Sequence, residues 1–235
     1  EKLIPGFNYP RPSIADGTDH SPPFTLRGLA PDQVLVLING KRLHQSSLLH
    51  VNGTIGRGSL GVDLTTIPLR SIERVEVLRD GAAAQYGSDA IAGIINIVLK
   101  SHDNENSANV SYGLTHKGDG ITRQSDLFYS LPLPEEGFAN VTLEARQRGA
   151  TNRAGVDIYN NHTLDTHFGD AQAQDLLSAF NVNVPKGDLI WYTQGTMSQR
   201  EGEAGAFFRN ARDFRNVTTV YPYGYLPSIQ PTIRD

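Results

Sequence analysis

The hydrophobic and polar residues of this chain follow two different patterns, which change near Lys100. Before that point, short apolar runs alternate with glycine turns and stretches of small residues. After it, apolar and polar residues alternate one by one over long runs, as in strands with one apolar and one polar face. The stretch 101–106 is polar and rich in turn-forming residues. We therefore predict two domains, residues 1–100 and residues 101–235.

The first pattern predicts a compact α+β unit. Val34–Ile38 is apolar throughout, as expected of a strand buried on both faces. Asn39 and Gly40 follow it and predict a type I′ hairpin turn, which requires positive φ at both central residues. We expect Asp80 to cap a small-residue helical turn that Gly87 ends. Further elements are a short helical segment from 67, and strands at 74–78 and 94–100.

The second pattern predicts five antiparallel strands. In 138–146, Val141 and Leu143 point to one side of the strand, and Thr142 and Glu144 to the other. Similar runs lie at 109–115, 126–131 and 180–184, and a less regular one at 189–198. Short Pro/Gly turns alternate with a connection from 149 to 172, an asymmetry typical of outer-membrane β-barrels. A soluble β-sandwich alternates in the same way, so periodicity alone leaves both architectures open.

Composition excludes several classes of protein. The 235 residues include 21 basic and 25 acidic side chains, a net charge of −4 with no basic tract, so we expect no nucleic-acid partner. The absence of cysteine excludes disulfide scaffolds, Cys-ligated zinc and thiol catalysis. No apolar run approaches the ~18 to 20 residues of a membrane helix. The mean hydropathy of −0.35 is compatible with a transmembrane β-barrel, whose alternating strands keep hydropathy low.

Several motifs of the first hundred residues occur in a fixed order. They are the segments 24–29, 34–42, 67–68 with 72–80, 85–88 and 92–97. In sequence and spacing they resemble the plug domain of TonB-dependent outer-membrane receptors. The later strands, down to 221–227, resemble the start of the barrel of such a receptor. The resemblance implies an α+β plug seated in an antiparallel transmembrane barrel of about 22 strands.

The resemblance also implies a function. Such receptors bind a scarce nutrient, such as a siderophore, cobalamin or a saccharide, and release it inward when the TonB–ExbB–ExbD complex pulls on a TonB box. It implies a bacterial outer-membrane location, contact with outer-membrane lipid, no cofactor and no enzymatic activity. About 22 strands of ~10 residues need ~220 residues. Residues 101–235 are too few for that, and no TonB box precedes the first motif, so we expect a fragment of a longer receptor.

The same resemblance supplies candidate site residues. Arg27 and Arg79 match plug arginines that face carboxylates of the barrel wall and lock the plug, because a buried guanidinium requires paired carboxylates. Two plug loops at the extracellular apex map to 29–33 and 44–61 and are expected to contact the ligand. Ordinary solvated loops are the alternative. The candidates in these loops are Asp32, Gln33, His44, Gln45, His50, Asn52 and Arg57.

Two other classes of function stay open at this point. One is a soluble β-rich carbohydrate-binding or adhesion module. The other is a nucleotide-binding oxidoreductase, because 56–61 matches G-x-G-x-x-G; no apolar strand precedes this motif and no phosphate-binding helix follows it. The histidines show no metal-ligand spacing, so we predict no metal site, with a Ca²⁺ site in the acidic loop near His162 and His167 as the alternative. Trp191 fits an interfacial aromatic girdle, or else a core position.

Overall fold

A computed structural model describes residues 4–15, 17–51, 54–101, 106–155, 167–206 and 232–234. We call residues up to 101 the N-terminal part; its strands are β1 (Phe7–Asn8), β2 (Thr25–Leu26), β3 (Val34–Ile38), β4 (Lys41–Arg42), β5 (Ile72–Leu78) and β6 (Gly93–Leu99), and its helices are α1 (Ala82–Tyr86) and the 3₁₀ turns η1 (Pro31–Gln33), η2 (Leu64–Thr66), η3 (Leu69–Ser71) and η4 (Ser88–Ala90). None of the helices in the described ranges is long and apolar enough to cross a membrane.

The N-terminal part is built on a four-stranded sheet of order β4-β3-β6-β5, in which β3 and β6 are parallel. Every residue of β3 is buried, as predicted. Val34, Val36 and Ile38 pack into the main core, and Leu35 and Leu37 pack into a second core with α1 and η4 on the other face. Both central residues of the β3–β4 turn have positive φ, which confirms the predicted hairpin.

The predicted cap of the helical turn is wrong in one respect. Gly81, at φ 72°, is the N-cap of α1, and no side chain caps the helix. The Asp80 carboxylate instead accepts a hydrogen bond from Arg27. Gly87 ends the helix as expected, since its N–H donates to the Ala83 carbonyl. The Asp80 carboxylate therefore binds the Arg27 guanidinium rather than the backbone N–H groups at the start of α1.

The large sheet has six antiparallel strands in the order β12-β11-β10-β9-β8-β7. Their bounds are β7 (Ser107–Gly113), β8 (Thr122–Leu133), β9 (Gly137–Arg148), β10 (Gln172–Lys186), β11 (Leu189–Gly205) and β12 (Thr232–Arg234). The five predicted strands are therefore joined by a short sixth. β8 to β11 are 12 to 17 residues long, more than the ~9 to 11 of a membrane crossing. The segment 221–227 lies outside the described residues.

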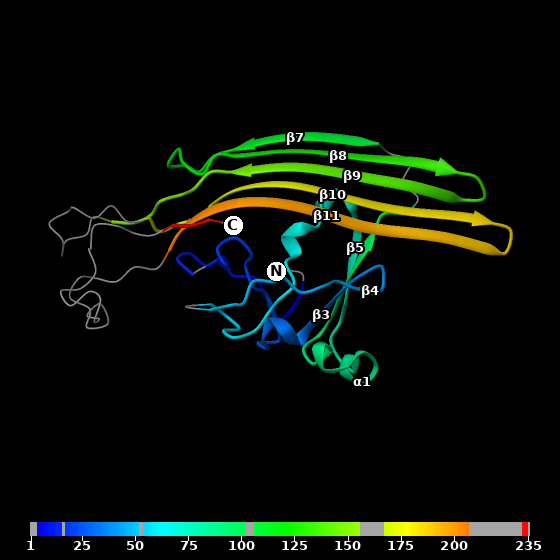
Figure 1. Ribbon diagram of the computed structural model, residues 1–235, viewed down its shortest axis with the longest axis horizontal. Coiled ribbons are helices and arrows are strands. Elements are labelled where there is room, and N and C mark those ends of the chain that lie inside the picture. The colour runs from blue at the N-terminus through cyan, green and yellow to red at the C-terminus, as the bar shows by residue number, and fades with distance from the viewer. Residues whose placement is uncertain are drawn as a thin grey trace.

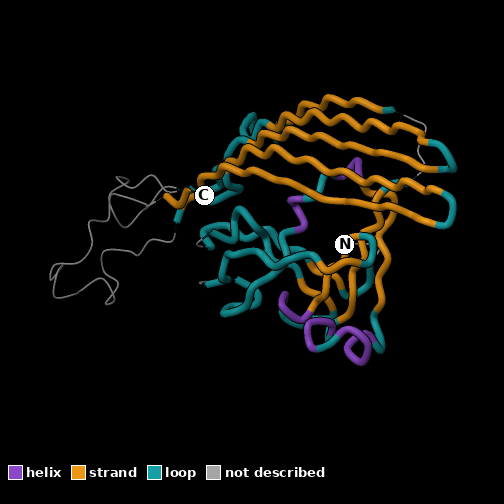
Figure 2. The backbone as a smooth tube through the Cα atoms, turned by 45° about the vertical axis from the view of Figure 1, so that its right-hand side comes forward, coloured by secondary structure: helices purple, strands orange, loops and turns teal. Residues whose placement is uncertain are grey.

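The two faces of the large sheet have opposite character. The N-terminal part lies against one face, which we call the inward face (Figure 1, Figure 2). Inward side chains such as Thr142 and Glu144 are 1% exposed. Outward apolar side chains such as Val110 and Met197 are 83% and 72% exposed. In a β-sandwich the apolar face would be packed against a second sheet, so this arrangement favours a lipid-facing sheet.

Candidate functional site

The contact between the N-terminal part and the large sheet is centred on the segment 63–71, which includes η2 and η3. Asp63 caps η2, because its carboxylate accepts a hydrogen bond from the Thr65 N–H at 2.8 Å. Pro68 precedes η3, whose Leu69 N–H donates to the Glu144 carboxylate of β9 at 3.2 Å. The two turns thus present backbone and side-chain polar groups to the inward face.

Arg200 of β11 makes the densest of these contacts. Its guanidinium donates to the Asp63 carboxylate at 3.0 Å and to the carbonyl oxygen of His20 at 2.6 Å. It also donates to the hydroxyl of Thr65 and to the carboxylate of Asp175 on the neighbouring strand β10. Arg200 therefore joins two segments of the N-terminal part, one at His20 and the other at 63–65.

Asp175 connects Arg200 to the next strand. Its other carboxylate oxygen accepts a hydrogen bond from Arg146 of β9 at 2.9 Å. Arg146 in turn donates to the Thr65 carbonyl at 3.2 Å and lies 3.5 Å from the Glu144 carboxylate. Asp175 and Glu144 are 8% and 1% exposed, so their carboxylates have lost most of their hydration. The neighbouring guanidinium groups and the Leu69 N–H compensate for that loss.

A separate ion pair lies on the β7 side of this cluster. Arg70 of η3 donates to the Asp126 carboxylate of β8 at 2.9 Å, and Asn109 of β7 donates to its second oxygen at 3.2 Å. We call the whole set the charged contact, and its members are Asp63, Arg70, Asp126, Glu144, Arg146, Asp175 and Arg200.

Uncharged amides make the contact nearer the short turns. Asn140 donates to the carbonyl oxygens of Lys100 and Ser101, and Asn181 donates to that of Lys100. Gln194 donates to the Ile38 carbonyl at 3.0 Å. These amides hold the end of β6 and the β3 hairpin against the sheet without any buried charge.

The predicted lock residues lie elsewhere. Arg27 donates to the Arg79 carbonyl at 2.7 Å and to Asp80 at 3.2 Å, and its side chain is half-exposed. Arg79 is exposed. Among the described residues, the hydrogen-bond partners of the Arg27 side chain belong to the N-terminal part, and the ion pairs with the large sheet come from the charged contact.

The two candidate loops pack against each other. A Cβ on Gly61 would lie 3.1 Å from Pro31 and 3.2 Å from the His50 ring, so the loop 44–61 rests directly on η1. His50 is 2% exposed, and one carboxylate oxygen of Asp32 is also buried. Gln33 is half-buried, whereas His44, Gln45 and Arg57 are exposed. Asn52 lies outside the described residues.

The loop 44–61 extends toward the end of the sheet that carries the long connections (Figure 1). Its residues Ser46, Ser47 and Leu48 line a pocket together with Asp175 and Arg200 of the sheet. Among the candidates that the structure describes, His44, Gln45 and Arg57 are the exposed ones and can meet a solute arriving at that end.

Burial of His50 predicts a pH dependence. Desolvation lowers the pKa of the His50 imidazole below its usual range, although the Asp32 carboxylate raises it. The unfolded chain therefore binds the proton more readily than the folded chain. The contribution of neutral His50 to the free energy of unfolding is fully present above the ordinary pKa of ~6.5 and is lost as the pH drops below that value. Urea unfolding of the N-terminal part at pH 7.5 and 5.5 should show a loss that is smaller in His50→Gln. Equal losses in both proteins would contradict the assignment to His50. Burial also raises the pKa of the Asp19 carboxyl, but Asp19 is present in both proteins and therefore cannot cause a difference between them.

Other sequence features take ordinary positions. The residues 56–61 lie in a loop, followed by the three-residue turn η2 rather than by a phosphate-binding helix. Trp191 is outward and 69% exposed, close to the short β10–β11 turn, where an interfacial girdle is expected. His162, Asp157 and Asp165 lie outside the described residues. The described ones, which include His167 and Asp170, contain no group of three metal-ligating side chains.

Comparison with known proteins identifies the family. The TonB-dependent Receptor Plug Domain family matches residues 1–94. The chain is 29% identical over 170 residues to the ferric enterobactin receptor PirA of Pseudomonas aeruginosa, and this alignment covers 70% of this chain and 22% of PirA. It is 31% identical over 180 residues to the vitamin B12 transporter BtuB of Vibrio vulnificus, and this alignment covers 77% of this chain and 26% of BtuB.

Solved structures show the same fold. A point mutant of the ferric enterobactin receptor PfeA of Pseudomonas aeruginosa, in complex with enterobactin, superposes with a TM-score of 0.53 at 22% identity, over 86% of this chain and 30% of that chain. The chain thus spans about a quarter of the length of the relatives that it matches. It belongs to the TonB-dependent outer-membrane receptors, with a plug domain followed by strands of the barrel, and its place is the bacterial outer membrane.

Proposed function

We propose that this chain is the plug and the opening wall of a receptor that takes up a scarce nutrient of the siderophore or cobalamin class. Uptake is energised by the TonB–ExbB–ExbD complex, and the receptor catalyses no reaction. The observation that carries the proposal is the seating of a folded α+β unit on the polar face of a sheet whose apolar face is exposed. The relatives PirA and BtuB are named for ferric enterobactin and vitamin B12, which supports this substrate class.

We assign ligand capture to the exposed residues His44, Gln45 and Arg57, with Asp32, Gln33 and His50 shaping the loops beneath them. We assign the hold on the plug to the charged contact. Arg27 and Arg79 are proposed to meet other parts of the wall, since both are exposed on the N-terminal part.

Uptake in cells tests the proposal. The complete receptor should restore uptake of a radiolabelled ferric siderophore or cobalamin to a strain that lacks its own receptors, and a strain without TonB should show binding but no uptake. Replacing His44, Gln45 and Arg57 together by Ala should weaken binding, and Lys117→Ala, in the β7–β8 loop, should not. Uptake that is independent of TonB would contradict the proposal.

We also propose that the boundary between the two domains lies near Lys100. β6 ends at Leu99 and β7 begins at Ser107, and the cores of the N-terminal part are made by residues up to Leu99. Residues 1–100 alone should therefore fold in buffer, with circular dichroism of an α+β unit and a cooperative urea transition. A random-coil spectrum would contradict this boundary.

A further inference from the structure

One turn near the start of the chain is buried against both the large sheet and the loop 44–61. It consists of residues 14, 15 and 17–20, and we call it the buried turn. Its side chains Thr18, Asp19 and His20 are 0%, 6% and 4% exposed. Polar side chains are mostly exposed in folded proteins, so a buried polar turn requires a structural reason.

Hydrogen bonds within the buried turn give it a fixed shape. The Ala15 N–H donates to the Asp19 carboxylate at 3.0 Å, and the Thr18 hydroxyl donates to the Ala15 carbonyl at 2.9 Å. The His20 N–H donates to the Gly17 carbonyl at 3.1 Å. A turn that is cross-linked in this way moves as a unit, because a shift of one residue strains the bonds of the others.

The His20 ring lies directly on the backbone of β11 at Gly202. A Cβ atom at Gly202 would lie 2.3 Å from the His20 Nδ1 atom and 2.7 Å from its Cε1 atom. Both distances are too short for a non-bonded contact, so glycine alone admits the ring at this position. The neighbouring side chains on the inward face are also small and buried, namely Ala171, Ala173 and Ala204. The large sheet therefore has a depression that receives the ring.

The loop 44–61 packs against another part of the buried turn. Gly17 has a φ of 101°, and a Cβ there would lie 3.1 Å from a methyl carbon of Leu48. Leu48 and His20 also line one cavity of about 340 Å³ together with Arg200 of the charged contact. The buried turn is thus held at two places, by the large sheet at His20 and by the loop at Gly17.

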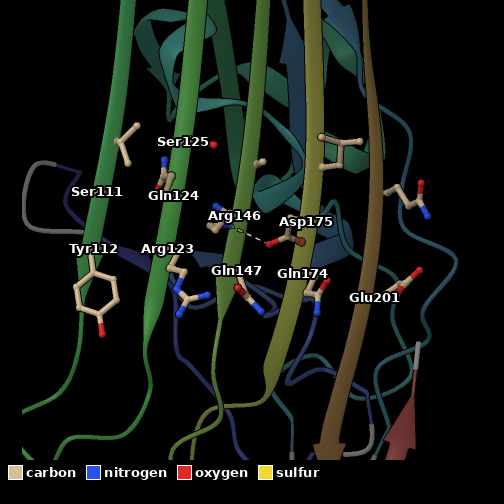
Figure 3. Close-up of a pocket in the computed structure, with 14 residues that line it drawn as sticks. Ser111, Tyr112, Arg123, Gln124, Ser125, Arg146, Gln147, Gln174, Asp175 and Glu201 are labelled. Atoms are coloured by element: carbon tan, nitrogen blue, oxygen red, sulfur yellow. Dashed lines mark hydrogen bonds and ion pairs between the residues drawn. The ribbon is translucent and has the colours of Figure 1, made fainter.

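His20 also contacts Arg200, the central cation of the charged contact. Arg200 lies two residues before Gly202 on β11 and faces inward, and its guanidinium donates to the His20 carbonyl oxygen at 2.6 Å. It also donates to Asp175, which is seen with its second partner Arg146 in Figure 3. The ring and the carbonyl of His20 thus contact two successive inward residues of β11, and the position of the ring determines that of the carbonyl.

We propose that His20 is a positioning residue for the charged contact. Its ring, seated on Gly202, places the carbonyl oxygen that orients the Arg200 guanidinium toward the segment 63–71. The fit of His20 on the large sheet thereby determines how readily this segment leaves the sheet. That such opening belongs to uptake rests on the proposed function, whereas the positioning and its test involve neither a nutrient nor TonB.

Hydrogen exchange of the complete receptor in detergent micelles tests the positioning. In Gly202→Ala the new methyl group overlaps the ring, so His20 must shift and its carbonyl moves away from Arg200. The equilibrium constant for opening of the segment 63–71 should rise about tenfold to a hundredfold, the effect of losing one hydrogen bond to a charged group. The amides of β3, in the core of the N-terminal part, should exchange as in the parent protein.

Two further variants distinguish positioning from a general loss of packing. His20→Ala removes the ring and keeps the carbonyl, so in combination with Gly202→Ala it leaves room for the new methyl group. The double variant should therefore open less than Gly202→Ala alone. Gly195→Ala, on the outward face of the same strand, places a Cβ 2.7 Å from the Phe180 ring and should leave the opening of 63–71 unchanged. Additive effects of His20→Ala and Gly202→Ala, no rise in Gly202→Ala, or an equal rise in Gly195→Ala would overturn the proposal.

Discussion

Replacing Asp175 by Ala should weaken the hold of the large sheet on the plug by about 3–5 kcal/mol. Asp175 is nearly buried and lies between Arg146 and Arg200, and it accepts a hydrogen bond from each. Its removal leaves two mostly buried guanidinium groups with one anion fewer. The free energy of opening of the segment 63–71, measured by hydrogen exchange in the detergent-solubilised receptor, should fall by this amount.

Two variants separate this effect from a general loss of charge. Asp175→Asn keeps the shape and one acceptor oxygen, so its effect should be intermediate. Glu203→Ala breaks a more exposed ion pair, between Glu203 of β11 and Arg234 of β12. It should change the opening free energy of the segment 63–71 by less than ~1 kcal/mol. Equal effects of Asp175→Ala and Glu203→Ala would show that the charged contact does not hold the plug.

Replacing Leu143 by Arg should destabilise the receptor in a bilayer by about 2–4 kcal/mol. Leu143 is outward and half-exposed, near the middle of β9. A guanidinium there must be desolvated by lipid or must deform the bilayer around it. Reversible unfolding by guanidinium chloride in phospholipid vesicles measures the change.

Gln147→Arg is the matched control for this variant. It introduces the same side chain on the same face of β9, four residues further on, next to the end of the strand. At the interface, the cost of an arginine falls to about 0–1 kcal/mol. A similar cost at both positions would mean that the outward face does not meet hydrocarbon.

The parts of this fold that local patterns determine were predictable from sequence. The Asn39–Gly40 turn needs only its own two residues to adopt positive φ, and the alternation of 138–146 needs only the two-residue period of a strand. The change of pattern near Lys100 likewise reflects a change from a sheet that is buried on both faces to a sheet with one polar and one apolar face.

The charged contact was not predictable in the same way. Arg200 and Asp175 are adjacent on paired strands, but Asp63 and Thr65, to which Arg200 donates hydrogen bonds, are more than a hundred residues away from it in the chain. Glu144 was recognised as facing the polar side, and the same periodicity extended to Arg200 would have placed it on that side too. Which plug residue meets it depends on how the plug is seated. Asp80, expected as a helix cap, likewise binds a residue far away in the chain, Arg27, which local patterns do not reveal.

An accessibility scan along β9 is the most direct test of the arrangement of plug, wall and lipid. Single cysteines from Ala139 to Ala145 would carry nitroxide labels in the complete receptor in vesicles, and collision with molecular oxygen would be measured at each. The structure predicts high oxygen accessibility at 139, 141, 143 and 145 and low accessibility at 140, 142 and 144, which face the plug. Uniform values, or maxima at the even positions, would contradict it.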